Sequence, residues 1–278
     1  MSNTIVNTNV SALNSHRQIL SVGGRQSRSS ERLSSGQRIN RAADDAAGLA
    51  ISENMRNQIR GLDQATRNSQ DGISLVQTAE GALEEVHRMA ERIRQLTVQS
   101  ANDTNSTENR NQIQTEIQQL TDDMVRIAND TQFNGMNLLS GQVSTFGIQS
   151  GANSAQRINI TITGITAAID ALSATVHTAA DLTSGNLVSN RLTNIDTFIS
   201  SINDLRSNLG AVQNRLEHTI NSLSVSSENL SAANSRIRDT DMAAEMMAFT
   251  QANVLQQAGM SMLAQANQAP NNILQLVG

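Results

Sequence analysis

The side chains that could support acid–base or metal chemistry are few and lie far apart in the sequence. Two pairs of neighbouring carboxylates, Asp44–Asp45 and Asp122–Asp123, could suggest a general acid and base. Because adjacent residues of a helix point about 100° apart around its axis, helix starts and solvated faces explain such pairs better. The four histidines lack the spacing of metal ligands, and we expect them to be packed or solvated. They are His16, His87, His177 and His218.

Five methionines gather near the C-terminus and could suggest a soft metal site. They are Met242, Met246, Met247, Met260 and Met262. Thioether side chains adapt to irregular apolar surfaces, so we favour packing at a subunit interface. The chain also lacks cysteine, a phosphate-binding glycine loop and a nucleophile elbow. We therefore expect neither an enzyme nor a bound metal or cofactor.

An arginine-rich stretch near the N-terminus carries six arginines against one glutamate between Arg17 and Arg41. Arg25, Arg28 and Arg32 lie on one helical face, a pattern that could contact phosphates. No aromatic residues interleave with them and the net charge of the chain is −5, so we expect no nucleic acid partner. If the two terminal helices run antiparallel, carboxylates at the start of the last helix would face these arginines and set the helix register. These carboxylates are Asp239, Asp241 and Glu245.

The composition of the 278 residues restricts the fold that positions these side chains. Trp and Tyr are absent, four residues are Phe, and 38% are hydrophobic, so the core must consist of aliphatic side chains in thin helical layers. All 20 basic residues are arginine, which nucleotide bias or adaptation to high temperature would explain. No apolar run reaches the ~18 residues that span a bilayer, so we expect no membrane partner. Residues 1–10 do not resemble a signal peptide, so export would need a route that does not use one.

Apolar residues recur at helical spacing in three segments, which we predict to be long helices. These segments cover residues 55–93, 113–127 and 192–230, and cap-forming residues at 102–108 separate the first two. Near residues 144–163 apolar residues instead occupy every second position, which predicts a β-hairpin. Its strands contain Phe146 and Ile148 on one side and Ile158, Ile160 and Ile162 on the other. The predicted fold is all-α with a small β-hairpin.

Two features of the remaining sequence concern its middle and its ends. Residues 164–189 could hold a short helix at 167–176 and a loop at 181–186. Residues 1–15 and 246–278 carry no charged side chain but have apolar residues at helical spacing. Ordering roughly 75 terminal residues costs on the order of 100 kcal/mol, which two lone helices with small side chains cannot recover by burying one face.

We therefore expect both ends of the chain to be largely disordered in the monomer and to fold when other subunits cover them. A helix without a charged face needs apolar neighbours on most sides. The side chains expected to pack in this assembly are Val6, Val10, Leu13, Leu20, Met242, Met246, Phe249, Leu255 and Leu263.

Several motifs, in order along the chain, resemble those of bacterial flagellins. They are IVNTN (5–9), LSSGQRINRAADDAAGLAI (33–51), TQFNG (131–135), LGAVQNRL (209–216) and SMLAQAN (261–267). The likeness covers roughly residues 1–163 and 190–278. It implies a subunit of the flagellar filament, exported unfolded through the flagellar type III apparatus, which polymerises into an extracellular filament for swimming motility.

The resemblance also implies a division into domains and a set of partners. Residues 1–44 with 238–278 would form a discontinuous coiled-coil inner-tube domain of long antiparallel helices. Residues 45–237 would form a rod-like helical-bundle domain with the hairpin, and 164–189 a short insert in place of outer domains. Besides copies of the chain itself, the implied partners are an export chaperone, the filament cap and hook-junction proteins.

A host receptor is a further partner that the resemblance implies. Residues 91–100 (ERIRQLTVQS) are similar to the helical stretch that Toll-like receptor five recognises in some flagellins. Arg92, Leu96 and Glu116 occupy the matching positions.

Two other interpretations of the sequence stay open. A hook–filament junction protein shares the plan of the terminal helices but would not extend a filament indefinitely. A cytoplasmic coiled-coil adaptor would be helical as a monomer and would show no ordering of its ends on assembly.

Overall fold

The computed structural model describes residues 8–141, 145–176 and 185–277. In these ranges the chain forms six helices and two pairs of short antiparallel strands, so the predicted fold class is confirmed. The chain divides into two compact units: unit 1 is Met1–Asn57 with Asn229–Gly278, and unit 2 is Gln58–Glu228. The division into an inner-tube domain (1–44 with 238–278) and a rod-like domain (45–237) refers to the filament and stays a prediction.

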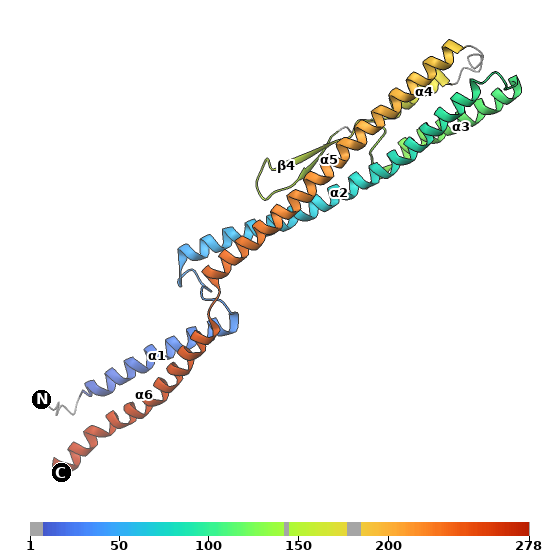
Figure 1. Cartoon of the computed structure of the whole chain (residues 1–278). Coiled ribbons are helices and arrows are strands. Elements are labelled where there is room, and N and C mark those ends of the chain that lie inside the picture. The colour runs from blue at the N-terminus through green and yellow to red at the C-terminus, as the bar shows by residue number, and fades with distance from the viewer. Residues whose placement is uncertain (1–7, 142–144, 177–184, 278) are drawn as a thin grey trace. The chain divides into compact units, whose positions relative to one another are not determined.

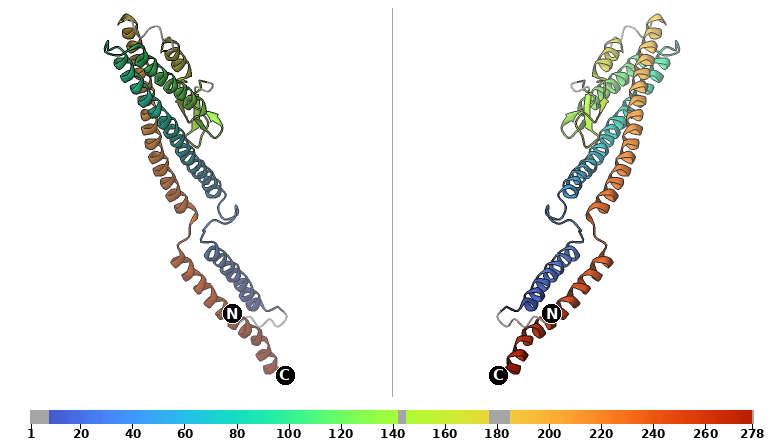
Figure 2. Two further views of the ribbon diagram at one scale, coloured as in Figure 1. Left: turned by 90° about the vertical axis from the view of Figure 1, so that its right-hand side faces the viewer. Right: turned by 90° about the vertical axis from the view of Figure 1, so that its left-hand side faces the viewer.

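Unit 1 contains two long antiparallel helices, α1 (Val10–Ser35) and α6 (Met242–Val277), which lie side by side in Figures 1 and 2. The Asn9 side chain caps the start of α1 by accepting a hydrogen bond from the backbone N–H of Ala12 at 3.0 Å. Its amide also donates to the backbone oxygen of Ala266 at 2.7 Å, which ties the start of α1 to α6. At the other end of α1, Gly36 has φ +69° and donates its N–H to the carbonyl of Arg32 at 2.8 Å, as a left-handed helix cap requires.

The segments that follow α1 and precede α6 are paired through their backbones. Gln37 and Asp239 form an isolated antiparallel bridge. The N–H of Arg38 donates to the carbonyl of Arg238 at 2.7 Å, and the N–H of Thr240 donates to the carbonyl of Gly36 at 3.1 Å. These bonds fix where the chain leaves α1 relative to where it enters α6.

Unit 2 contains α3 (Thr107–Asp130) and most of two longer helices, α2 (Ala46–Ser100) and α5 (Gly185–Arg238), whose outer ends belong to unit 1. The three helices run side by side (Figures 1 and 2). The shorter α4 (Thr166–Val176) packs against α3. Ser106 caps α3, because its hydroxyl accepts from the N–H of Asn109 at 3.2 Å. The core is aliphatic, as the composition predicts. Its fully buried large side chains include Leu83, Ile93, Leu96, Ile117, Met124, Leu138, Ile160, Ile169 and Ile195.

The predicted hairpin consists of β3 (Thr145–Gln149) and β4 (Arg157–Thr161). Phe146 pairs with Ile160, and Ile148 pairs with Ile158. The hairpin is anchored to α2, because the Asn68 amide donates to the backbone oxygen of Gln149 at 3.1 Å.

A second strand pair was not predicted: β1 (Gln132–Phe133) and β2 (Met136–Asn137). Between them Asn134 and Gly135 have φ +49° and +76°, the two-residue turn that suits tight hairpins.

Two other predictions concern the insert. The short helix expected at 167–176 is present as α4, and α5 begins at Gly185, earlier than the predicted position 192. Most of the loop expected at 181–186 lies outside the described residues.

Candidate assembly surface

The contact between α1 and α6 is narrow and consists of small side chains. In α1, only Val22 and Ser29 are buried. In α6, Ala252 is the only buried residue among the side chains described from 242 to 268. Gly259 lies beside Ile19, where an added Cβ would come within 2.9 Å of the isoleucine side chain. Each helix therefore uses one thin stripe for its partner and leaves most of its surface open.

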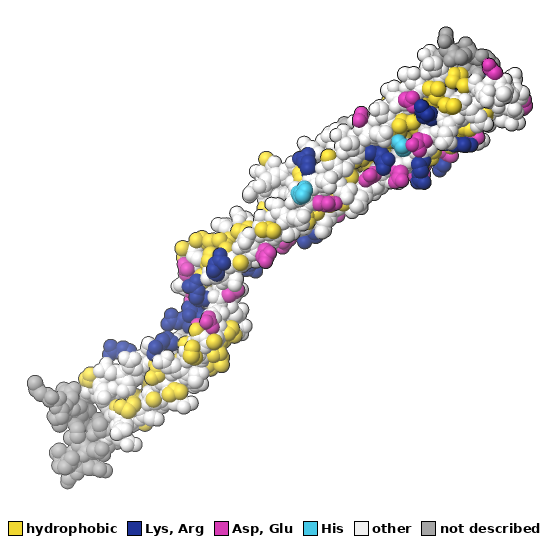
Figure 3. All heavy atoms as spheres, viewed as in Figure 1, with side chains coloured by type: hydrophobic (Ala, Val, Ile, Leu, Met, Phe, Trp, Pro, Cys, Tyr) yellow, Lys and Arg dark blue, Asp and Glu magenta, His cyan; other side chains and the backbone are white. Residues whose placement is uncertain are grey.

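That open surface is apolar. Six of the predicted assembly side chains are between 41% and 63% exposed: Val10, Leu13, Leu20, Met242, Met246 and Leu255. Phe249 and Leu263 are half-buried, and Val6 lies outside the described residues. Figure 3 shows hydrophobic side chains gathered over the α1 and α6 helices. Four further exposed apolar side chains join them in α6: Met247, Val254, Met260 and Met262.

Part of the apolar face of α6 is a shallow hollow. Its lining is Met246, Met247, Thr250, Gln251, Val254 and Leu255. These side chains carry no charge, and the sequence has no charged side chain from Met246 to its end. Monomeric soluble proteins rarely expose apolar surface in this concentrated form, so the face has the character of an interaction surface.

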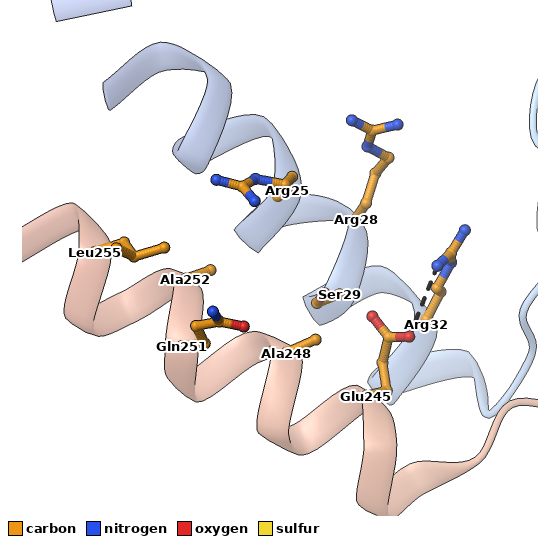
Figure 4. A pocket seen from close by; sticks show the side chains of 9 residues that line it. All are labelled: Arg25, Arg28, Ser29, Arg32, Glu245, Ala248, Gln251, Ala252 and Leu255. Atoms are coloured by element: carbon orange, nitrogen blue, oxygen red, sulfur yellow. Dashed lines mark ion pairs between the residues drawn. The ribbon is translucent and has the colours of Figure 1, made fainter. Parts of the chain in front are cut away.

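A charged groove of about 390 Å³ lies between α1 and α6 nearer their paired ends (Figure 4). It is lined by Arg25, Arg28, Ser29, Arg32, Glu245, Ala248, Gln251, Ala252 and Leu255. An Nη atom of Arg32 lies 3.7 Å from a carboxylate oxygen of Glu245, and the glutamate side chain is only 13% exposed. Attraction between these charges favours one register of α1 against α6.

The other predicted charges have different surroundings. Asp241 caps α6, because its carboxylate accepts from the N–H groups of Ala243 and Ala244 at 2.9 and 3.2 Å. Asp239 takes part in the backbone bridge to Gln37. Within the described ranges, Arg25, Arg28, Asp239 and Asp241 form no ion pair. The structure therefore brings one arginine of the stripe together with one carboxylate.

A polar cluster that sequence reasoning missed lies beside the paired segments of unit 1. The Arg238 guanidinium donates to the side-chain oxygen of Gln37 at 2.9 Å and to the Glu53 carboxylate at 2.5 Å. The hydrogen bond from Arg238 lowers the pKa of Glu53 below its ordinary value, and Arg56 adds to this effect. The Asp44 carboxylate accepts from the N–H groups of Asn40 and Arg41, and these bonds lower its pKa. No spacing rule could have identified Arg238 and Glu53 as partners, because 185 positions separate them.

The three residues matched to the receptor contact differ in their accessibility. Arg92 and Glu116 form an ion pair between α2 and α3 at 2.8 Å, and both side chains are nearly half exposed. Leu96 is 2% exposed and belongs to the core of unit 2. A macromolecule that docks on this surface of unit 2 would meet the ion pair and not the Leu96 side chain.

Two of the neighbouring carboxylates that could suggest acid–base chemistry cap or pair with nearby groups of their own helices. Asp45 stands directly before α2, and its carboxylate accepts from the N–H of Gly48 at 2.9 Å, so its prediction as a helix start is confirmed. Asp123 pairs with Arg126 one turn away at 2.7 Å. Among the described residues, no three histidine or acidic side chains are grouped so that they could hold a metal ion. In the same ranges, no helix combines the length and apolar character needed to cross a bilayer.

Comparison with known proteins identifies the family. The family model of the bacterial flagellin N-terminal helical region matches residues 6–144, and that of the C-terminal helical region matches residues 192–277. A flagellin of Halalkalibacterium halodurans is 52% identical over 98% of this chain and 99% of its own length. A flagellin of Bacillus subtilis is 48% identical over the same shares of the two chains.

A solved structure shares the fold at lower identity. A protein from Vibrio parahaemolyticus, described as a flagellar hook-associated protein, superposes with a TM-score of 0.60 and 16% identity. The superposition covers 70% of this chain and all of the other. At this identity the likeness concerns the fold alone, whereas both flagellin family models match and the identity to the two flagellins extends over nearly the whole chain. The chain therefore belongs to the bacterial flagellin family.

Proposed function

We propose that the α1 and α6 helices form the surface through which this chain polymerises, and that this surface becomes enclosed only in the polymer. As a flagellin, the chain is a structural protein and not an enzyme, and it assembles with copies of itself into the extracellular flagellar filament. The proposal concerns which part of the chain carries the assembly. It assigns residues 1–44 and 238–278 to the inner tube of the filament and 45–237 to a surrounding rod-like layer.

One observation carries the proposal: α6 has a single buried residue, Ala252, among its described side chains from 242 to 268. Helical stability in proteins comes mostly from packing of an apolar face, and this pair packs very little of its own. Covering a Leu or Met that is about half exposed gains roughly 1 kcal/mol, so ten such side chains supply a substantial driving force for association. We infer that free subunits leave these helices largely disordered and that neighbours order them.

Polymerisation into an open filament requires contacts that do not close into a ring. A surface that binds a different surface of the next copy repeats indefinitely and generates a helical array. Two long helices that expose apolar side chains on several sides can accept different neighbours on each side. A propeller also needs curvature, which identical subunits provide when their packing has two states that differ slightly.

Transport to the filament tip adds partners to this proposal. An export chaperone would cover the apolar residues of α6 before export, since the same residues would otherwise associate in the cell. The filament cap and the hook-junction proteins would meet the terminal helices at the two ends of the growing polymer. A host Toll-like receptor would dock on unit 2 beside the exposed Arg92–Glu116 pair.

The experiment uses the distribution of arginines, which are the only sites for trypsin in this chain. Filaments are dissociated by heat, and the free subunits are treated briefly with trypsin. Disordered ends would be cut at Arg17 to Arg41 and at Arg236 or Arg238, whereas arginines inside the helices of unit 2 would resist. The trimmed subunits should then fail to extend filament seeds, and intact subunits should extend them. Ends that resist trypsin in the free subunit would contradict the proposal, because the terminal helices would then hold their structure without neighbours.

A pair of variants tests the surface itself. Met246→Gln places a polar side chain on the apolar face of α6, and Met136→Gln makes the same change at an exposed methionine of β2. We expect the first variant to lose seeded extension and the second to keep it, with equal helix content in both free subunits. Equal extension by the two variants would contradict the assignment of the α6 face to assembly.

A further inference from the structure

Oxidising agents have one main class of target in this chain. The sequence contains no cysteine, tryptophan or tyrosine, so the thioether of methionine is its most readily oxidised side chain. Five of the ten methionines lie between Met242 and Met262 in α6. Oxidation chemistry is therefore concentrated in one helix.

The methionines of α6 are also the most exposed of those that the structure describes, since Met136 in β2 is 40% exposed. Met242, Met246, Met247, Met260 and Met262 are between 47% and 69% exposed, whereas Met124 in the core of unit 2 is 0% exposed. Oxidation requires contact between the oxidant and the sulfur atom, so exposure determines which methionines react. In the free subunit the α6 methionines should react first.

Met246 and Met247 have surroundings in which oxidation would matter most. Both line the shallow hollow of α6 together with Val254 and Leu255, and the polar groups of its lining belong to Thr250 and Gln251. A sulfoxide replaces an apolar thioether by a strongly polar S=O group. If a neighbouring copy covers the hollow, that group is buried in a mostly apolar lining whose donors are confined to Thr250 and Gln251, and the Thr250 hydroxyl already donates to the backbone oxygen of Met246 at 2.8 Å. Burial of so polar a group among few donors is costly.

We propose that Met246 and Met247 form a reversible oxidation site that controls whether a subunit can enter the filament. The inference rests on the proposed function, because it requires that neighbouring copies cover α6. The oxidant is a peroxide. A sulfur lone pair attacks one oxygen of hydrogen peroxide, and the S–O bond forms as the O–O bond breaks. The other oxygen departs as hydroxide, takes up the proton that the sulfur-bound oxygen loses, and leaves as water. Sulfur is oxidised by two electrons and the peroxide is reduced by two.

The same site responds differently in the two states of the protein. A free subunit exposes both sulfur atoms and becomes unable to assemble once they are oxidised. A subunit within the filament has them covered and is protected. A methionine sulfoxide reductase removes the added oxygen and returns the subunit to the assembly-competent form.

The arginine pattern makes the site easy to follow by mass spectrometry. No arginine or lysine follows Arg238, so trypsin releases all five α6 methionines in one peptide, residues 239–278. Met124 appears in the peptide 111–126 and Met136 in the peptide 127–157. Fragmentation of the first peptide assigns each added oxygen to Met246, Met247 or another position.

The test compares free subunits and filaments after the same mild treatment with hydrogen peroxide. We expect added oxygen at Met246 and Met247 in the free subunits, little at these positions in filaments, and none at Met124. The oxidised subunits should lose extension of untreated seeds, and methionine sulfoxide reductase should restore it. Equal oxidation of Met246 and Met247 in filaments, or undiminished extension by oxidised subunits, would overturn the inference.

Two variants assign the effect to these residues. Met246→Leu with Met247→Leu keeps the hollow apolar but cannot be oxidised there. Peroxide should therefore not reduce the rate at which this variant extends seeds, compared with its own rate before treatment. Met136→Leu removes an exposed methionine of unit 2 and should lose extension after peroxide, as the unsubstituted chain does. Loss of extension by the oxidised double variant would assign the effect to other methionines and contradict the inference.

If untreated, unsubstituted subunits failed to extend seeds, the proposed function itself would be wrong. If the untreated double variant failed to extend seeds, fragmentation of the peptide 239–278 from partly oxidised, unsubstituted subunits would assign the effect. Subunits that fail to extend seeds should carry added oxygen at Met246 or Met247, and added oxygen only at other positions would overturn the inference.

Discussion

The Arg238 guanidinium, at the end of α5, donates a hydrogen bond to the carboxylate of Glu53, near the start of α2. The same guanidinium donates to Gln37, which lies in the segment that follows α1. One arginine therefore holds together three parts of unit 1 that are remote in the sequence. The bond favours the ionised form of Glu53 and lowers its pKa.

This cluster should make filaments sensitive to acid. Because the pKa of Glu53 is lowered in the folded chain, its contribution to stability is present above the ordinary glutamate value of 4.5 and is lost as the pH falls through the lowered pKa. Glu53→Gln should therefore reduce the temperature at which filaments dissociate at neutral pH, and this difference should vanish in acid. Light scattering during heating at several pH values measures both. Arg238→Gln should reproduce the effect, and the double substitution should add little. A difference that is independent of pH would show that the pair is not responsible.

Leu96 should affect stability and not the surface chemistry of unit 2. It is 2% exposed, whereas Val98 on the same helix is 49% exposed. Leu96→Ala should reduce the free energy of unfolding of the free subunit by about 2–4 kcal/mol, because it leaves a cavity in the core. Val98→Ala should change it by roughly 0.5 kcal/mol or less. Urea denaturation followed by circular dichroism measures both values. Equal effects would contradict the assignment of Leu96 to the core.

Gly164 should tolerate no side chain. A Cβ at this position would lie 2.1 Å from the Cα of Gly141 and 2.3 Å from its backbone nitrogen. Since backbone atoms cannot rotate away, Gly164→Ala should cost about 1–3 kcal/mol in the free energy of unfolding. Gly81→Ala in α2 is the matched control, since nothing lies within 4 Å of its Cβ position and alanine favours helix. In thermal denaturation, Gly164→Ala should lower the midpoint temperature of unfolding, and Gly81→Ala should raise it slightly. The reverse order would refute the close approach of the two glycines.

The Arg32–Glu245 pair should influence assembly more than subunit stability. Arg32→Glu places two carboxylates together and should slow seeded extension, whereas exchange of the two residues should recover part of the rate. The partly exposed pair itself contributes only about 1 kcal/mol or less. Arg28→Glu should have a smaller effect, because Arg28 forms no ion pair in the described part of the chain. Normal extension by both single variants would refute a role of these charges in register.

The long helices and the β3–β4 hairpin were predictable because their apolar residues recur at regular spacing along the sequence. The spacing of Ile158, Ile160 and Ile162 indicated a strand, and β4 covers the first two of them. The shorter β1–β2 pair has too few residues for a period, although Asn134-Gly135 is a known hairpin signal and could have identified the turn. The family likeness pointed to Leu96 as a surface contact, whereas its spacing of three from Ile93 agrees with its place in the core.

The candidate assembly surface was predictable in part. A lack of charge and a helical spacing of apolar residues indicated the exposed positions Leu13, Leu20 and Met246. The position of Asp241 just before α6 also predicts that it caps this helix. The hypothesis of a charge register instead placed it opposite the arginines of α1. The Arg238–Glu53 bond could not be predicted, since it depends on how distant segments meet in space.

Hydrogen exchange at the backbone amides of α6, measured in free subunits and in filaments, shows whether this helix needs neighbouring subunits to fold. We expect rapid exchange throughout residues 242–268 in dilute free subunits and strong protection of the same amides in filaments. The buried helices of unit 2 should be equally protected in both states. Strong protection of α6 in the free subunit would contradict the proposed function, because the helix would then hold its structure without neighbours.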